Sequence, residues 1–206
     1  MRAEATRFPP CWWGCSLEKA GLPTLRPRIG TYGRYAYEPL PPVPSEAQDL
    51  AWLAHASTHR SHIGQERVDD LPRATAGLRA AAPATGLALP GAFLRFIETP
   101  ELQARVRSNT DCFLDVCDAP VPLPTGDGHL VRFLADSQSV LFWYLYFPTT
   151  GQDHAVLASG TFYGTPQESW QEEDEEESPL EFVAESFEHF LWRFWVENEL
   201  WFAVYP

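Results

Sequence analysis

The alternation of apolar and polar positions after residue 110 predicts β-strands. Apolar runs separated by turn signals lie at 112–116, 130–134, 139–147 and 155–163. In the third run, one set of side chains faces one way (Val140, Phe142, Tyr144, Tyr146) and the next set faces the other way (Leu141, Trp143, Leu145, Phe147). Because both sets are apolar, we predict that this strand is central and covered on both faces.

A long apolar helix is predicted at 186–202, with Ser186 as its N-cap. Apolar residues follow the i, i+3, i+4, i+7, i+8 spacing of one helical face: Phe187, Phe190, Leu191, Phe194 and Trp195. Trp192, Val196 and Leu200 widen this stripe. A helix with so many apolar residues must have its apolar surface covered, either by a sheet or by a partner in addition.

The first half of the chain predicts shorter helices. Ser45 and Gln48 have capping-box spacing, which predicts a helix that starts at Ser45 and stops near Gly64. An alanine-rich helix is expected over 71–82, and a short one over 89–98. Thr99 and Pro100 then resemble the cap and first residue of a new helix.

Composition divides the chain into three parts. Residues 1–44 are rich in proline and aromatic residues and read as an irregular N-terminal extension, whose aromatics favour wrapping around the domain. Residues 45–88 form a helical segment, and 89–206 form the domain that carries the predicted strands.

Charge and hydropathy restrict the partners. The formal net charge of −13 argues against nucleic acid and anionic membranes, and it is compatible with a basic protein partner. The longest apolar run, 140–147, is too short for a transmembrane helix, and the N-terminus lacks a secretory h-region. We therefore expect a cytoplasmic protein whose four cysteines are thiols.

Residues 89–202 resemble the SUKH superfamily, the cell-wall-assembly-regulator-like proteins that include many bacterial immunity proteins. The resemblance rests on LPGAFLRFIE at 89–98, on the strand ending in HAVLASGTF at 154–162, and on VAESFEHFLWRFWVENEL at 183–200. Within the last segment the best-matching positions are Ala184, Ser186, Phe187, Phe190 and Leu191.

The resemblance implies an α+β fold for the SUKH-like domain at 89–206, with helices packed on a mostly antiparallel sheet of four or more strands. It also implies that the protein binds another protein, often a toxin domain that it neutralises.

An acidic run is the sharpest surface feature of the sequence. It comprises Glu168, Glu172, Glu173, Asp174, Glu175, Glu176, Glu177 and Glu181, with no basic residue among them. Such a block speeds association with a basic surface, and it could occupy the cleft of a nucleic-acid-cleaving toxin as a phosphate mimic. The acids at 168–177, together with Trp170 and Trp192, are the predicted partner-binding residues. The alternative is a disordered, solubilising loop.

Histidine and cysteine offer two possible metal sites. His55, His59 and His62 have i, i+4, i+7 spacing, which places imidazoles on one face if the helix continues that far. The alternative is a polar helix end. Cys11, Cys15, Cys112 and Cys117 do not have the short spacing of zinc knuckles, so free cysteine is the expectation.

Catalytic motifs are absent from the sequence. It has no G-x-S-x-G elbow, P-loop or dinucleotide fingerprint. The neighbours Asp127 and His129, and Asp153 and His154, fall in predicted turns, where Asp serves the backbone. We predict a non-catalytic immunity protein without cofactor or metal. The alternatives are a general protein-interaction or scaffold module, and a metalloprotein or hydrolase that uses the three histidines. The oligomeric state is left open.

Overall fold

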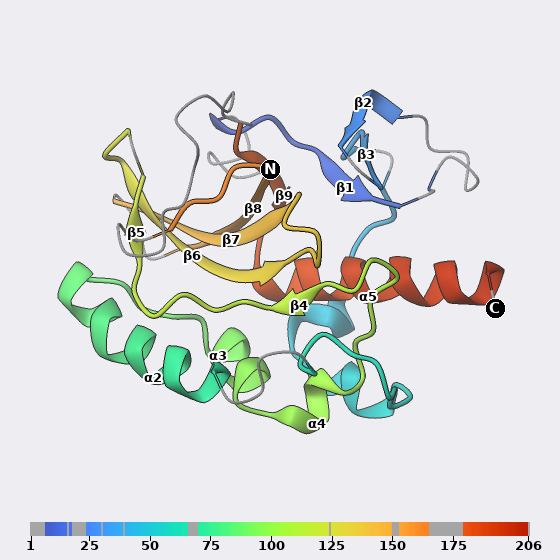
Figure 1. Ribbon diagram of the computed structural model, residues 1–206, viewed down its shortest axis with the longest axis horizontal. Helices are drawn as coiled ribbons and strands as arrows, with labels where there is room; N and C mark the ends of the chain where they lie inside the picture. Colours follow the sequence, from blue (N-terminus) through green and yellow to red (C-terminus); the bar gives the residue numbers. More distant parts are fainter. Residues whose placement is uncertain are drawn as a thin grey trace.

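A six-stranded antiparallel sheet forms the centre of the computed structural model, which describes residues 7–15, 17, 24–29, 31–38, 40–65, 70–123, 125–149, 153–164 and 179–205. Five strands follow the order β4-β6-β7-β8-β9, and β5 also pairs with β6. Their bounds are Phe113–Leu114 (β4), Val121–Pro122 (β5), Gly128–Ala135 (β6), Phe142–Pro148 (β7), Ala155–Ser159 (β8) and Glu181–Ala184 (β9). Helices pack on this sheet (Figure 1), so the predicted α+β class is confirmed.

Strand β7 is the central strand that its alternation predicts. It pairs with β6 on one side and β8 on the other, and residues 142–147 are all buried. Trp143 and Leu145 belong to the apolar cluster on the helix side, whereas Tyr144 and Tyr146 belong to a second cluster. The second cluster includes Phe8 from the start of the described chain. Both faces of β7 are therefore covered.

A second, three-stranded sheet corrects the prediction that the N-terminal region is irregular. It contains Trp12–Gly14 (β1), Thr24–Ile29 (β2) and Tyr32–Tyr35 (β3), in the order β1-β3-β2. The chain before β1 also pairs with β9, because the Phe182 amide donates to the Pro9 carbonyl at 3.0 Å and the Cys11 amide donates to the Phe182 carbonyl at 2.9 Å. This region therefore wraps the larger sheet, as its aromatic content predicts.

The predicted helix from Ser45 to Gly64 is wrong. Two 3₁₀ helices, Ser45–Gln48 (η2) and Ala51–His55 (η3), take its place. Ser45 makes no cap, since its hydroxyl donates instead to the Glu46 carboxylate at 3.2 Å. Asp49 is extended between the two segments, and its carboxylate accepts a hydrogen bond from the Ala51 amide at 2.8 Å. This side-chain turn competes with a continuous helix.

The remaining helices follow the predicted positions closely. Helix α2 spans Leu71–Ala81 and continues into a 3₁₀ turn at Ala82–Thr85 (η4). Helix α3 spans Gly91–Ile97, and the four-residue α4 spans Pro100–Gln103 with Pro100 in its first turn. Helices α2, α3 and α5 lie on the same side of the larger sheet (Figure 1).

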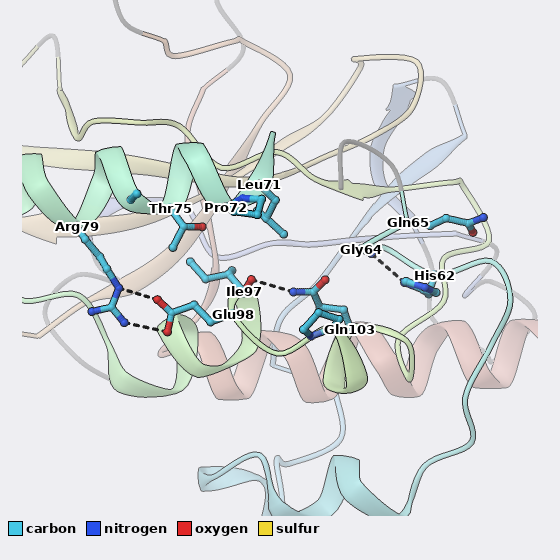
Figure 2. A pocket seen from close by; sticks show the side chains of 12 residues that line it. His62, Gly64, Gln65, Leu71, Pro72, Thr75, Arg79, Ile97, Glu98 and Gln103 are labelled. Atoms are coloured by element: carbon cyan, nitrogen blue, oxygen red, sulfur yellow. Dashed lines mark hydrogen bonds and ion pairs between the residues drawn. The ribbon is translucent and has the colours of Figure 1, made fainter. Parts of the chain in front are cut away.

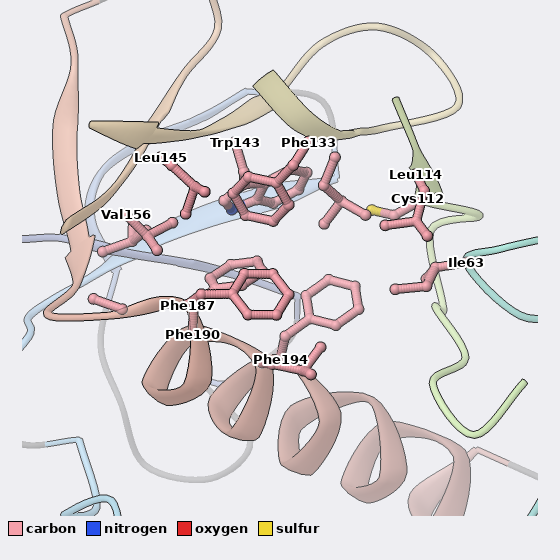
Figure 3. Close-up of a cluster of buried hydrophobic side chains, with 14 of the residues drawn as sticks. Ile63, Cys112, Leu114, Phe133, Trp143, Leu145, Val156, Phe187, Phe190 and Phe194 are labelled. Atoms are coloured by element: carbon pink, nitrogen blue, oxygen red, sulfur yellow. The ribbon is translucent and has the colours of Figure 1, made fainter. Parts of the chain in front are cut away.

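Helix α5, Phe187–Val204, closes the core. Ser186 is its cap, because the Ser186 hydroxyl accepts a hydrogen bond from the His189 amide at 3.3 Å. The inner face of α5 packs Phe187, Phe190 and Phe194 beneath Trp143 and Leu145 of β7 (Figure 3). Burial of these aromatic rings on the sheet provides most of the driving force for docking α5.

One buried apolar cluster runs through the whole described chain. Its members include Trp12 from the N-terminal extension, Leu53 and Leu78 from the middle segment, and Phe133 and Phe187 from the strand-rich part. Residues from all three predicted parts therefore share one core, while the domain boundaries themselves stay a prediction. None of the helices in the described ranges is both long and apolar enough to cross a membrane.

Candidate functional site

The second half of α5 carries apolar side chains outward as well as inward. Leu200 is 57% exposed and Val204 is 62% exposed, and they are the two large hydrophobic residues that stand out as exposed among those described. With Trp192 and Val196 they form a line at i, i+4, i+8 and i+12 along the helix. This line is separate from the inner stripe that the sheet buries, so it remains available for contact.

Part of this line borders a shallow groove, which we call the α5 groove. Trp192, Val196 and Leu200 form one side of it, and Leu17, Leu40 and Pro41 lie across from them. Trp12, Arg193 and Glu197 complete the lining, and the groove encloses about 130 Å³. Its walls come from α5 and from the N-terminal region, which lie far apart in the sequence.

Trp192 is held in place by two other tryptophans. Its ring centroid lies 4.9 Å from that of Trp52 on η3 and 5.7 Å from that of Trp195 on α5. The side chain is half-buried, so it presents a fixed edge rather than a mobile one to the groove. Its predicted contact with a partner stays a prediction.

Glu197 is the one acidic residue among the described residues that line the groove. Its carboxylate accepts hydrogen bonds from the indole nitrogen of Trp12 and from the backbone amide of Cys15, both at 2.6 Å. Burial raises the pKa of Glu197 to about 7, although both hydrogen bonds favour the charged form. A change of pH near neutrality therefore changes the charge of the groove.

A close approach explains the glycine at position 14. A Cβ atom on Gly14 would lie 2.7 Å from the Glu197 Oε1 atom and 2.9 Å from the Leu17 Cδ1 atom. Glycine thus allows β1 to pack directly on α5, and this contact positions one wall of the groove.

Of the predicted partner-binding residues, the structure describes Trp192. The positions Glu168, Trp170, Glu172, Glu173, Asp174, Glu175, Glu176 and Glu177 lie outside the described residues. Glu181 corrects the sequence-based grouping, because it lies in β9, is only 1% exposed and pairs with Arg34 at 3.3 Å. It belongs to the core and not to the acidic surface.

The histidines do not have the helical spacing on which the metal alternative depends. His55 ends η3, whereas His59 and His62 lie in the irregular chain that follows. The described residues contain no group of three or more His, Cys, Asp or Glu arranged to hold a metal ion. His59 lies 3.4 Å from Glu199, and the His62 Nδ1 atom accepts a hydrogen bond from the Gly64 amide at 3.2 Å.

The cysteines are buried free thiols. Burial raises the pKa of Cys11 and of Cys15 to about 12 and that of Cys112 to about 11. These three thiols therefore stay protonated at neutral pH, and protonated thiols are poor nucleophiles.

One residue from each of the two neighbouring Asp and His pairs, Asp127 and His154, makes contacts that stabilise the fold. Asp127 pairs with Arg7, which also donates to the Tyr146 hydroxyl at 2.9 Å. The His154 Nε2 atom accepts a hydrogen bond from the Phe187 amide at 3.2 Å and so helps to start α5. These contacts fix Arg7 and the start of α5 to the larger sheet.

Comparison with known proteins identifies no relative of this chain. Searches against protein-family models, curated proteins and solved structures each find no match to this chain. The resemblance to the SUKH superfamily therefore stays a prediction from the sequence.

Proposed function

We propose that this chain is a non-catalytic protein-binding protein, of the immunity type, which neutralises a toxin domain by stoichiometric binding. The observation that supports this proposal is the apolar line along α5. Leu200 and Val204 remain exposed, whereas Phe187, Phe190, Leu191 and Phe194 of the same helix are buried. An exposed apolar line beside a preformed groove is typical of a surface that buries itself against another protein.

The dimensions of the α5 groove and of the apolar line beside it favour a protein ligand over a small molecule. The groove holds about 130 Å³, below the roughly 300–1,000 Å³ of most small-molecule pockets. The line from Trp192 to Val204 extends about 18 Å along the helix, which suits a helix or strand of a partner. Trp192, fixed at the edge, would act as the aromatic anchor of such an interface.

The charge favours a basic partner. The chain carries a formal net charge of −13, and the acids at 168–177 contribute much of it. A dense group of negative charges attracts a basic surface from a distance and so accelerates association. We propose that the apolar groove supplies most of the contact, while the acidic run supplies orientation and rate.

The exposed pair on α5 also favours a second candidate, a general interaction or scaffold module. Such a module would bind several partners or associate with itself through Leu200 and Val204. An immunity protein would instead form a one-to-one complex with one partner, so stoichiometry distinguishes the two candidates.

The test is a titration with one defined partner. Affinity purification from the native cell nominates that partner, and the product of the adjacent upstream gene is the first candidate. We expect a one-to-one complex in calorimetry that salt weakens, and Leu200→Ser should reduce its affinity about tenfold or more. Ala203→Ser, at an exposed α5 position outside the groove, is the matched control.

Neutralising Glu172 to Glu177 tests the charge separately. Replacement of these residues by the corresponding amides should lower the association rate and flatten its salt dependence. If Leu200→Ser binds as tightly as the control, the α5 groove is not the interface. If the amide variant keeps its salt dependence, the acidic run has no role in binding.

A further inference from the structure

A larger pocket lies among the helices, away from the α5 groove. It is bounded by α2, by the end of α3, by α4 and by the turn at 62–65 (Figure 2). The pocket has a volume of about 610 Å³, and its lining shares no residue with the α5 groove. This volume falls in the range that small-molecule pockets occupy, roughly 300–1,000 Å³.

The apolar walls of this pocket are parts of the core. Leu71 is 8% exposed and Ile97 is 3% exposed, and both face neighbours in the main apolar cluster. Pro72 and Pro100, each in the first turn of its helix, complete the apolar lining. Proline in a first turn sacrifices no backbone hydrogen bond, so these walls expose little polar backbone.

One polar atom in the lining has no partner within the described chain. Thr75, on α2, is 5% exposed, and its hydroxyl oxygen makes no hydrogen bond. A threonine in a helix usually satisfies its hydroxyl by donating to the carbonyl one turn earlier. Here the side chain projects from α2 toward Ile97 and Glu98 across the pocket (Figure 2). Thr75 therefore lines the pocket with a hydroxyl that has no hydrogen-bond partner among the described residues.

Among the described lining residues, the charged side chains Arg79 and Glu98 balance each other, and Gln103 is held by the backbone. The Gln103 amide nitrogen donates to the carbonyls of Phe96 and Ile97 at 3.0 Å and 2.9 Å. At the rim Arg79 and Glu98 form a two-pronged ion pair, with contacts of 2.6 Å and 2.9 Å. Burial and the neighbouring His59 lower the pKa of His62, which keeps that imidazole neutral at physiological pH.

We propose that this pocket binds a small, uncharged, mainly apolar molecule with a carbonyl group, to which the Thr75 hydroxyl donates a hydrogen bond. A charged ligand would lose its hydration here without gaining a counter-charge, because Arg79 and Glu98 already neutralise each other. A ligand without an acceptor would leave the Thr75 hydroxyl buried and unpaired. This binding activity goes beyond the proposed function and does not depend on it.

The neutral naphthyl ketone prodan is a suitable probe for the full chain. It carries one carbonyl, and its emission shifts to the blue in apolar surroundings. We expect saturable one-to-one binding. Thr75→Val keeps the shape of the side chain and removes the donor, so it should weaken prodan binding about two- to tenfold. The parent dimethylaminonaphthalene lacks the carbonyl, so it should bind Thr75→Val at least as tightly as the original chain.

A pair of exposed alanines tests the location. Ala76 lines the pocket and Ala84 does not, and both are exposed on the surface, so tryptophan at either position leaves the core intact. Ala76→Trp should reduce prodan affinity at least tenfold, whereas Ala84→Trp should leave it unchanged.

Three results overturn the proposal. Equal prodan affinity in the Ala76→Trp and Ala84→Trp variants would show that the probe binds elsewhere, and absence of saturable binding would remove the site. Equal prodan affinity of Thr75→Val and the original chain would remove the proposed hydrogen bond and, with it, the requirement for a carbonyl. Circular dichroism confirms that each variant is folded.

Discussion

The indole nitrogen of Trp12 donates a hydrogen bond to the carboxylate of Glu197 at 2.6 Å, although the two residues are 185 positions apart. The same carboxylate accepts from the Cys15 amide, so two donors of the β1 region converge on one side chain of α5. The smaller sheet is thereby fixed to the closing helix. This contact also sets the distance between the two walls of the α5 groove.

The first prediction concerns the pH dependence of stability through Glu197. Burial raises the folded-state pKa of this carboxyl to about 7 from an ordinary 4.5. Between these values the folded chain keeps a proton that the unfolded chain has lost, so the free energy of unfolding falls as pH rises. We expect this contribution to decrease by about 2 kcal/mol from about pH 5 to about pH 8, measured by urea denaturation.

Glu197→Gln is the control for this prediction. It removes the titrating group and one hydrogen bond, so stability should fall but the decrease with pH should disappear. His59 and His62 act in the opposite direction, because burial lowers the pKa of each and their contribution to stability rises with pH. The difference between variant and original chain isolates Glu197. An unchanged slope in the variant contradicts the assignment.

The second prediction concerns the close approach at Gly14. Gly14→Ala should lower the free energy of unfolding by about 1–3 kcal/mol, because the added methyl overlaps the Glu197 carboxylate and the Leu17 side chain. Gly91→Ala is the matched control, since a Cβ there meets nothing within 4 Å and favours α3. Chemical denaturation of both variants measures the difference. Similar stability of the two variants would mean that β1 moves away from α5 at little cost.

Much of the sheet was predictable because its signal is local. The alternation in β7 placed its two apolar faces correctly, since each side chain of a strand follows the one before it by a fixed rotation. The apolar spacing of α5 likewise predicted the burial of Phe187, Phe190, Leu191 and Phe194, whereas Leu200, which the same stripe included, is exposed. The capping box at Ser45 misled because the Asp49 side chain captures the next amide and interrupts the helix. The capping-box signal therefore failed because a competing side-chain turn lies four residues further along the chain.

The candidate sites were less predictable because distant segments build them. Sequence reasoning placed Leu200 in the stripe of the closing helix, but it gave no indication that Leu17 and Leu40 lie opposite. The burial of Glu197 also depends on the N-terminal strands. In the pocket of Figure 2, the alanine-rich pattern predicted α2, whereas the unpaired hydroxyl of Thr75 follows from what α3 and α4 place around it.

The third prediction concerns the buried ion pair of the large sheet. Arg132, on β6, is 4% exposed and donates to the Asp115 carboxylate at 2.8 Å. Asp115→Asn removes a negative charge that the buried guanidinium contacts, so the free energy of unfolding should fall by about 3–5 kcal/mol. Asp70→Asn is the matched control, because the Asp70 pair with Arg73 is largely exposed and is worth less than about 1 kcal/mol.

A double variant tests how much of the destabilisation comes from the positive charge that Asp115→Asn leaves on Arg132. Asp115→Leu combined with Arg132→Met removes both charges and keeps apolar volume at the two positions. This double variant should be more stable than Asp115→Asn, because no charge remains buried without its counter-ion. Urea denaturation of all three variants measures their free energies of unfolding. If the double variant is as unstable as Asp115→Asn, packing of the Arg132 side chain over Phe162, at 4.3 Å, contributes more than the ion pair.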